Sequence, residues 1–226
     1  MLERQLRAVQ DRIEQACQRS GRKATDVELV LVTKGVEPTR VQAVYDLGHR
    51  DFGENKAQEL IEKTALLPND TKWHFIGTLQ TNKARLLTSQ VVLIHSVDRI
   101  ELAVELNKQA EKANINHNIL LQVNASGEAT KHGFRPEVME SMAGQIKALS
   151  RLTVRGLMTM GPKSQDEREA RATFSKTRNL RDYLKKQYPD LDWNYLSMGM
   201  SSDFEYAIEE GANLLRIGTA VFGPEK

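Results

Sequence analysis

The sequence is poor in the features that mark secreted, disulfide-bonded or membrane-spanning chains. It has a single cysteine, Cys17, in 226 residues, which excludes an internal disulfide framework and favours a reducing, cytoplasmic location. No apolar run approaches the roughly 18 residues that a membrane-spanning helix needs. The N-terminal residues carry charge but no apolar core, so they do not resemble a secretory signal. These absences predict a cytoplasmic globular protein that its own hydrophobic core stabilises.

A strong net charge is also absent. The 32 lysine and arginine residues nearly balance the 30 aspartate and glutamate residues, which leaves a net charge of +2. The composition therefore gives no electrostatic reason to expect nucleic acid or an anionic membrane as a partner. Motifs for dinucleotide, P-loop and α/β-hydrolase sites are missing as well. The 5 histidines are scattered without close ligand spacing or a cysteine cluster, so no metal site is predicted.

What the sequence does have is a regular alternation of short apolar runs with longer stretches of helical spacing. An opening helix is predicted over residues 3–20. Eight predicted strands follow, at residues 27–33, 51–55, 72–77, 91–97, 118–124, 153–159, 194–198 and 213–218. Helices between consecutive strands force parallel pairing, and eight parallel strands can close into a barrel.

No linker rich in proline, glycine or serine divides this alternating pattern. The sequence therefore predicts one α/β domain over residues 1–226, a single (β/α)8 TIM barrel with an extra N-terminal helix. A doubly wound open sheet is the alternative, because periodicity alone does not show that a sheet closes.

Lys34 is the most informative single residue, because the working face of such a barrel is built from the C-terminal ends of the strands. It comes directly after the first predicted strand, where a long cationic side chain would enter a partly desolvated mouth. Desolvation disfavours the ammonium and exposes a nucleophilic amine, which can condense with a carbonyl group. The alternative is a lysine that only reaches past the strand end to water.

A second group of candidates follows the last two predicted strands. Ser201 and Ser202 stand where a helix should begin, and Gly218 and Thr219 add backbone N–H groups and a hydroxyl. The loops after strands seven and eight commonly hold phosphate in this architecture. These small, donor-rich residues suit a phosphate dianion. Ser202 with Glu205 also forms a capping-box pattern, so Ser202 could instead serve only its own helix.

Three further polar residues are predicted inside strands. Arg216 interrupts the otherwise apolar last strand, where a buried arginine is costly unless it is paired or used. It either forms an internal ion pair with Glu54 or Asp203, or it donates to a ring nitrogen or an anionic ligand. His74 and His95 lie on neighbouring predicted strands and are expected to be hydrogen-bonded core residues.

In this order, these residues resemble the pyridoxal 5′-phosphate homeostasis proteins, a family similar to the barrel domain of bacterial alanine racemases. The matching segments span nearly the whole chain and are jointly specific. They are Leu-Val-Thr-Lys34, Phe52-Gly-Glu-Asn55, Trp73-His-Phe-Ile-Gly-Thr-Leu-Gln80 with Asn82-Lys83, Val123-Asn124 with Lys131-His-Gly133, Gly156-Leu-Met158, Leu196-Ser-Met-Gly-Met-Ser201 with Asp203, and Arg216-Ile-Gly-Thr-Ala-Val-Phe-Gly223.

The resemblance implies a fold-type III pyridoxal-phosphate barrel in which Lys34 carries the cofactor as an internal aldimine. Asn55 would lie near the ring substituents, Arg216 would face the pyridine nitrogen, and Lys131 matches a lysine used as a secondary cofactor contact. The residues implied to hold the phosphate are Ser201, Gly218 and Thr219, with Ser202 as a helper. The family usually has threonine after the aldimine lysine, so Gly35 removes a hydroxyl that would tune the site.

Two features argue against turnover by this chain. Arginine only donates hydrogen bonds, so a ring nitrogen facing Arg216 would stay unprotonated and the cofactor would stabilise carbanions less. The racemases add, by resemblance, a second β domain and a tyrosine from a partner subunit as acid/base. The sequence ends at Lys226, which leaves no room for that domain, and it offers no assured general base other than Lys34.

We therefore predict a pyridoxal 5′-phosphate-binding protein without catalytic residues, which holds the cofactor and releases it to apo-enzymes as transient recipients. The first alternative is a small pyridoxal-phosphate-dependent amino-acid racemase or lyase. The second is a sugar-phosphate barrel enzyme that uses Lys34 as its Schiff-base amine without a cofactor. The third is an interaction module whose polar mouth is incidental. A monomer is expected, because the sequence shows no pronounced exposed apolar seam.

Overall fold

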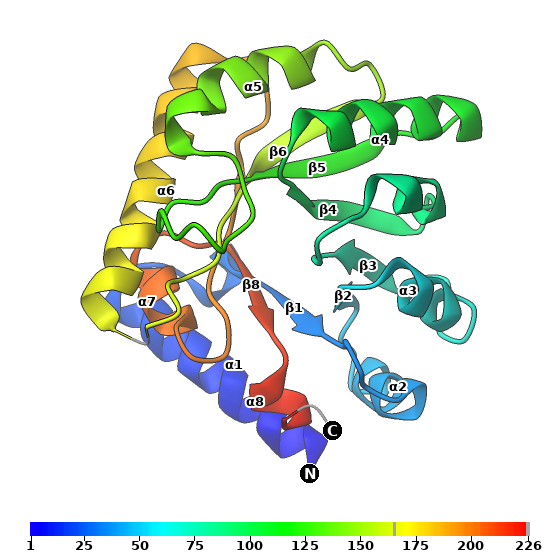
Figure 1. Cartoon of the computed structure of the whole chain (residues 1–226). Coiled ribbons are helices and arrows are strands. Elements are labelled where there is room, and N and C mark those ends of the chain that lie inside the picture. Colours follow the sequence, from blue (N-terminus) through cyan, green and yellow to red (C-terminus); the bar gives the residue numbers. More distant parts are fainter. Residues whose placement is uncertain (165, 225–226) are drawn as a thin grey trace.

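The computed structural model describes residues 1–164 and 166–224, and within them eight parallel strands close into a barrel (Figure 1). The strands are β1 (Glu28–Val32), β2 (Asp51–Glu54), β3 (Lys72–Phe75), β4 (Val91–Val97), β5 (His117–Gln122), β6 (Leu152–Met158), β7 (Tyr195–Ser197) and β8 (Leu214–Ile217). Each strand pairs with the next in sequence, and β1 also pairs with β8, which sets Leu31 opposite Ile217. The predicted (β/α)8 barrel is confirmed, and the open-sheet alternative is wrong.

Helices surround the strands on the outside of the barrel (Figure 1). The α-helices are α1 (Leu2–Arg19), α2 (Pro38–Asp46), α3 (Ala57–Thr64), α4 (Ile100–Ala113), α5 (Met139–Lys147), α6 (Glu167–Gln187), α7 (Phe204–Glu209) and α8 (Thr219–Phe222). The 3-10 helices are η1 (Ala24–Asp26), η2 (Thr81–Leu86) and η3 (Pro136–Val138). Within the described ranges, no helix is both long and apolar enough to cross a bilayer.

The extra N-terminal helix α1 packs against the C-terminal part of the chain, which forms one side of the barrel mouth. It buries one stripe at helical spacing, which consists of Leu6, Val9, Ile13, Ala16 and Cys17. This helix packs against α7 and α8, and Figure 1 shows α1 in blue beside α8 in red. Arg19 reinforces the contact through ion pairs of 2.8 Å with both Glu205 and Glu209 of α7. The two helices that follow β7 and β8 are therefore held in place from outside.

Alternation along the strands places both apolar and polar side chains in the barrel interior. A small buried cluster joins strands from opposite sides of the barrel and consists of Val30, Leu93, Leu120, Met158 and Leu214. Side chains two residues apart on a strand share a face. His95 lies two residues after Leu93, and Arg216 lies two residues after Leu214. Both polar residues therefore point inward as well, and both are buried.

Candidate ligand-binding site

The largest cavity at the site, of about 590 Å³, lies at the C-terminal ends of the strands. Among its lining residues are Lys34, Asn55, Lys131, Ser202 and Arg216. They come from segments separated by up to 182 residues in sequence, which the closed barrel brings to one mouth. This position is where (β/α)8 barrels generally carry their functional residues.

A second pocket, of about 290 Å³, adjoins this cavity. Lys34 lines both cavities, and Gly218 and Thr219 line the second one. Ser201 lies near the second pocket, because its Oγ accepts a 3.3 Å hydrogen bond from the backbone N–H of Ala220. The structure thus places six of the seven predicted binding residues on the walls of two adjoining cavities, with Lys34 common to both and Ser201 close by.

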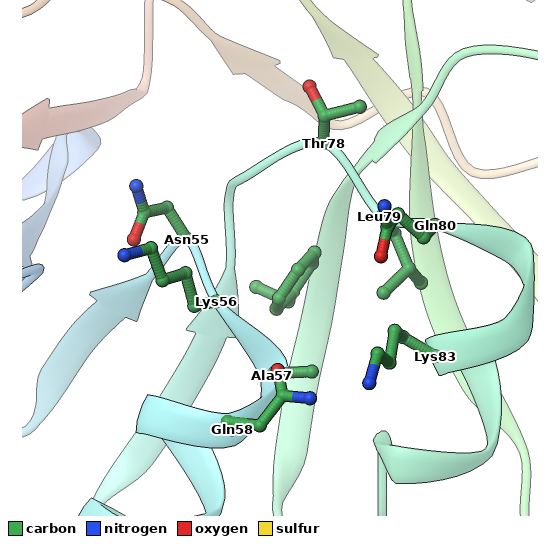
Figure 2. A pocket seen from close by; sticks show the side chains of 9 residues that line it. Asn55, Lys56, Ala57, Gln58, Thr78, Leu79, Gln80 and Lys83 are labelled. Carbon is green, nitrogen blue, oxygen red and sulfur yellow. The ribbon is translucent and has the colours of Figure 1, made fainter.

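A third pocket, of about 330 Å³, opens on the other side of Asn55 (Figure 2). It shares Asn55 and Thr78 with the large cavity. Lys56 and Lys83 reach it from the segments after β2 and β3, and Figure 2 shows their side chains on separate walls. The rim beside the large cavity therefore carries positive charge, which favours anionic ligands at this mouth.

Ser202 is not the cap of the helix that follows it. Asp203 occupies the N-cap position of α7, and its Oδ1 accepts a 2.6 Å hydrogen bond from the backbone N–H of Met200. Ser202 is exposed and lines the large cavity. The capping-box interpretation of Ser202 with Glu205 is therefore wrong, because the helix begins one residue later than that pattern requires. Glu205 instead pairs with Arg12 and Arg19 of α1.

Lys34 is held by its two sequence neighbours, which a buried ion cluster anchors. Lys63 of α3 donates to the backbone carbonyl of Thr33 at 2.6 Å, to Glu54 Oε1 at 2.7 Å and to Glu59 Oε1 at 2.8 Å. The hydroxyl of Thr33 also donates to Glu54. On the other side of Lys34, the N–H of Gly35 donates to Glu59 Oε1 at 2.7 Å. We call Glu54, Glu59 and Lys63 the Lys63 cluster.

The Lys63 cluster was not predicted from the sequence. Its weak signal is a pair of residues one helical turn apart, Glu59 and Lys63, at the start of a helix after an acidic strand end. Burial raises the pKa of Glu54, while hydrogen bonds from Lys63 and Thr33 and the charge of Lys63 oppose the increase. A carboxyl group and an amine buried this deeply stabilise each other, because water solvates neither of them.

The turn after Lys34 requires a left-handed backbone at Gly35. Its φ of +64° lies in a region that β-branched residues such as threonine strongly avoid. Glycine is therefore suited to this turn, which the hydrogen bond from Gly35 N–H to Glu59 holds in place.

Asn55 is placed by a close approach between two loops. A Cβ added to Gly77 would lie only 2.1 Å from the carbonyl oxygen of Asn55, so the segment after β3 packs directly on the segment after β2. The Asn55 Oδ1 atom is buried, and among the described residues it has no hydrogen-bond partner. Buried polar atoms normally have partners, so this acceptor indicates a place where a ligand atom or water belongs.

Arg216 is buried at 5% exposure and lines the large cavity. Its Nη1 donates to Ser197 Oγ at 2.6 Å, and its Nη2 donates to the Thr159 carbonyl at 2.9 Å. Burial lowers the pKa of Arg216 to about 10, against the charge of Asp203, which raises it. Arg216 is still a cation at neutral pH. Of the two carboxylates considered as ion-pair partners of Arg216, Glu54 pairs with Lys63 instead, and Asp203 acts on Arg216 through its charge.

Lys131, His74 and His95 are engaged with protein neighbours. Lys131 lines the large cavity and pairs with Glu128 at 2.7 Å. His74 and His95 contact each other at 3.0 Å, which confirms that they are hydrogen-bonded core residues. In residues 1–164 and 166–224, no group of three or more histidine, cysteine, aspartate or glutamate residues could hold a metal ion.

The fold and this arrangement define a (β/α)8 barrel with a lysine, an arginine and an amide around one mouth cavity. The sequence model of the family "Alanine racemase, N-terminal domain" matches residues 5–226. The pyridoxal phosphate homeostasis protein of Aquifex aeolicus is 45% identical over 222 residues, which cover 98% of this chain and 97% of that one. The chain therefore belongs to the pyridoxal phosphate homeostasis proteins, within the alanine racemase N-terminal domain family.

Solved structures agree with this assignment. PipY of Synechococcus elongatus, determined with PLP bound, is 34% identical, with a TM-score of 0.82 over 93% of this chain and 100% of that one. An alanine racemase of Clostridium difficile is 14% identical, with a TM-score of 0.76 over 99% of this chain and 55% of that one, and shares the fold alone. The resemblance predicted from the sequence motifs is confirmed.

We expect the Lys63→Met substitution to lower the free energy of unfolding by about 3–5 kcal/mol at pH 8, because it leaves Glu54 buried without its cation. The loss should shrink as the pH falls toward 5. The pKa of Glu54 is already raised in the folded state, and without Lys63 it rises further. The folded protein then binds this proton more tightly than the unfolded chain, so stability returns as the pH drops. Urea unfolding at both pH values measures this.

The double variant Glu54→Gln with Lys63→Met should recover part of the loss, because it removes the buried charge. Lys176→Met, at an exposed position of α6, is the matched control and should change stability by less than about 0.5 kcal/mol. Equal decreases in the free energy of unfolding for Lys63→Met and Lys176→Met would show that the Lys63 cluster does not stabilise the folded protein.

Proposed function

We propose that this protein binds pyridoxal 5′-phosphate, holds it through the amine of Lys34, and serves the storage and delivery of this cofactor. The observation that carries the proposal is the position of Lys34, which lines both the large cavity and the adjoining pocket. The names of the relatives, and the PLP bound in the PipY structure, support the identity of the ligand.

The residues of the site fit this group. When bound, pyridoxal phosphate supplies an aldehyde carbon, with which a lysine amine can condense reversibly. Lys34 is half-buried at the end of β1, and the Lys63 cluster fixes the backbone on both sides of it. The buried, unpartnered Oδ1 of Asn55 adds an acceptor for a ligand hydroxyl.

The phosphate end of the ligand belongs in the pocket that Gly218 and Thr219 line. Thr219 is exposed to that pocket and offers a hydroxyl, and the Ser201 hydroxyl lies beside it. Ser202 lines the large cavity and acts as a further donor. A dianion suits this place, because hydroxyl and backbone N–H donors converge there.

The ring end of the ligand belongs in the large cavity, which Arg216 lines. The guanidinium cannot give up a proton at neutral pH, so it presents only donors to a ring nitrogen. A nitrogen held in this way stays unprotonated, which weakens the cofactor as an electron sink. This is the reason for proposing a carrier without turnover of its own. We further propose one domain, a monomeric state, a cytoplasmic location, and apo-enzymes as transient recipients.

Incubation with pyridoxal phosphate followed by borohydride reduction should leave a stable mass increment on the peptide that contains Lys34. In Lys34→Ala this increment should be lost, since the attachment amine is gone. Peptide mass mapping measures both. Lys112→Ala, at an exposed position of α4, is the matched control and should label as the unaltered protein does. Primary labelling of a different lysine in the unaltered protein would contradict the assignment.

The double variant Ser201→Ala with Thr219→Ala should weaken pyridoxal phosphate binding roughly tenfold to a hundredfold, because each lost hydroxyl removes a hydrogen bond to a charged group. Binding of pyridoxal, which has no phosphate, should change by less than about threefold. Absorbance titrations of the two ligands measure the difference. Thr219→Ser keeps a hydroxyl and should bind both ligands normally; equal weakening toward both ligands would place the phosphate elsewhere.

Delivery is tested by mixing the loaded protein with an apo-enzyme in the presence of an aldehyde scavenger. Activity should return faster than in a control with the same amount of free pyridoxal phosphate, because the protein shields the aldehyde until transfer. A screen of L- and D-amino acids should find no racemisation or cleavage. Turnover that is lost in Lys34→Ala would instead establish the racemase or lyase alternative.

A further inference from the structure

A continuous chain of hydrogen bonds passes through the barrel interior and ends on Arg216. Arg216 Nη1 lies 2.6 Å from Ser197 Oγ, and Ser197 Oγ lies 2.8 Å from His95 Nδ1. His95 Nε2 lies 3.0 Å from His74 Nδ1, and His74 Nε2 lies 3.1 Å from Asp51 Oδ1. The first four residues are buried, with exposures of 5% or less.

The chain connects the ligand mouth with the opposite end of the barrel. Arg216 lines the large cavity at the mouth, whereas Asp51 is the first residue of β2, at the N-terminal end of the strands. From Ser197 of β7 to His95 of β4 the contact spans the barrel interior, because these strands are not neighbours in the sheet. Arg216 is therefore coupled to groups that no ligand in the mouth could touch.

The two ends of the chain fix its direction. Arg216 can only donate, so Ser197 Oγ must accept from it. Burial acts to raise the pKa of Asp51, but the hydrogen bond from His74 and the charge of Lys72 lower it overall. Asp51 is therefore ionised at neutral pH and can only accept.

With both imidazoles neutral, one arrangement of protons satisfies every contact between these ends. His74 donates through Nε2 to Asp51, His95 donates through Nε2 to His74, and Ser197 donates to Nδ1 of His95. Each imidazole then carries its proton on Nε2. Burial lowers the pKa of His95 well below its ordinary value, and the charge of Arg216 acts in the same direction. An added proton would place a second buried cation near Arg216 and would turn Nδ1 of His95 from an acceptor into a donor.

We propose that Ser197, His95 and His74 are positioning residues, which form a directed hydrogen-bond chain that fixes the guanidinium of Arg216 for the ligand in the mouth. Because the Ser197 proton is committed to His95, the serine oxygen can only accept from Nη1. The Thr159 carbonyl accepts from Nη2 in the same way. These two acceptors fix the orientation of the guanidinium plane on the side away from the ligand. The remaining N–H groups of Arg216 are then available as donors to a ligand in the cavity. This role rests on the proposed function, whereas the proton arrangement itself does not.

The test uses the full chain, first without ligand. Two-bond ¹⁵N–¹H NMR of the histidine rings should show both His74 and His95 as neutral Nε2–H tautomers at pH 7.5. In Ser197→Ala, His95 should keep its proton on Nε2, because His74 still accepts it, but the ¹⁵N signal of Nδ1 should shift, because that nitrogen loses its hydrogen-bond donor. In Ser197→Thr, which keeps the hydroxyl, this signal should stay as in the unaltered protein. A His95 that carries its proton on Nδ1, or that ignores the loss of the hydroxyl, would overturn the directed chain.

The second measurement adds pyridoxal phosphate and follows its absorbance. Ser197→Ala should weaken binding roughly tenfold, the lower end for one hydrogen bond to a charged group. It should also move the absorption maximum of the bound ligand, since Arg216 is no longer fixed. Ser197→Thr should restore both. Thr177→Val, which removes an equally buried hydroxyl of α6 outside the chain, should change neither.

The outcomes separate this proposal from the proposed function. If the unaltered protein binds no pyridoxal phosphate, the proposed function and the positioning role both fail, while the NMR result still decides the direction of the chain. If the ligand binds normally and Ser197→Ala changes neither affinity nor spectrum, the positioning role is wrong. A circular dichroism spectrum that matches the unaltered protein excludes misfolding of the alanine variant as the cause.

Discussion

The pairing of the first strand with the last is the constraint on which the site depends. β1 hydrogen-bonds to β8, which sets Leu31 opposite Ile217. Lys34 follows one strand and Thr219 follows the other, so closure places an amine from the start of the chain beside a hydroxyl from its end. An open sheet would leave these residues on opposite edges. The two adjoining cavities with a shared lysine are thus a direct consequence of barrel closure.

Closure alone does not orient the charged side chains, and each of the two central cations depends on buried partners. Lys34 is oriented through its neighbours, which the Lys63 cluster holds from behind. Arg216 is oriented through Ser197 and the Thr159 carbonyl. Burying such groups costs free energy unless every one of them is paired. The same principle accounts for both: the residue that faces the ligand is fixed by polar groups that the ligand does not touch.

The sequence was sufficient to predict the strands, the barrel and the position of Lys34 and Arg216 at its mouth, because apolar periodicity and a charge at a strand end are local signals. The roles of these two residues toward a ligand stay predictions. The sequence was insufficient where a contact joins distant segments. Glu54 was one of two candidate partners of Arg216, but it pairs with Lys63, and the choice between these cations depends on which side of β2 the carboxylate faces. Ser202 fitted a capping pattern, yet α7 begins at Phe204, because Asp203 occupies the cap position and binds the preceding backbone. The hydrogen-bond chain from Asp51 to Arg216 required the register of five strands, β2, β3, β4, β7 and β8, which no local pattern encodes.

The most direct test of the account is a crystal structure of this chain grown with pyridoxal 5′-phosphate. The account predicts continuous electron density from Lys34 Nζ to the aldehyde carbon, with the phosphate beside Ser201 and Thr219 and the ring nitrogen toward Arg216. Density for the ligand in the pocket between Lys56 and Lys83, with Lys34 unmodified, would contradict it.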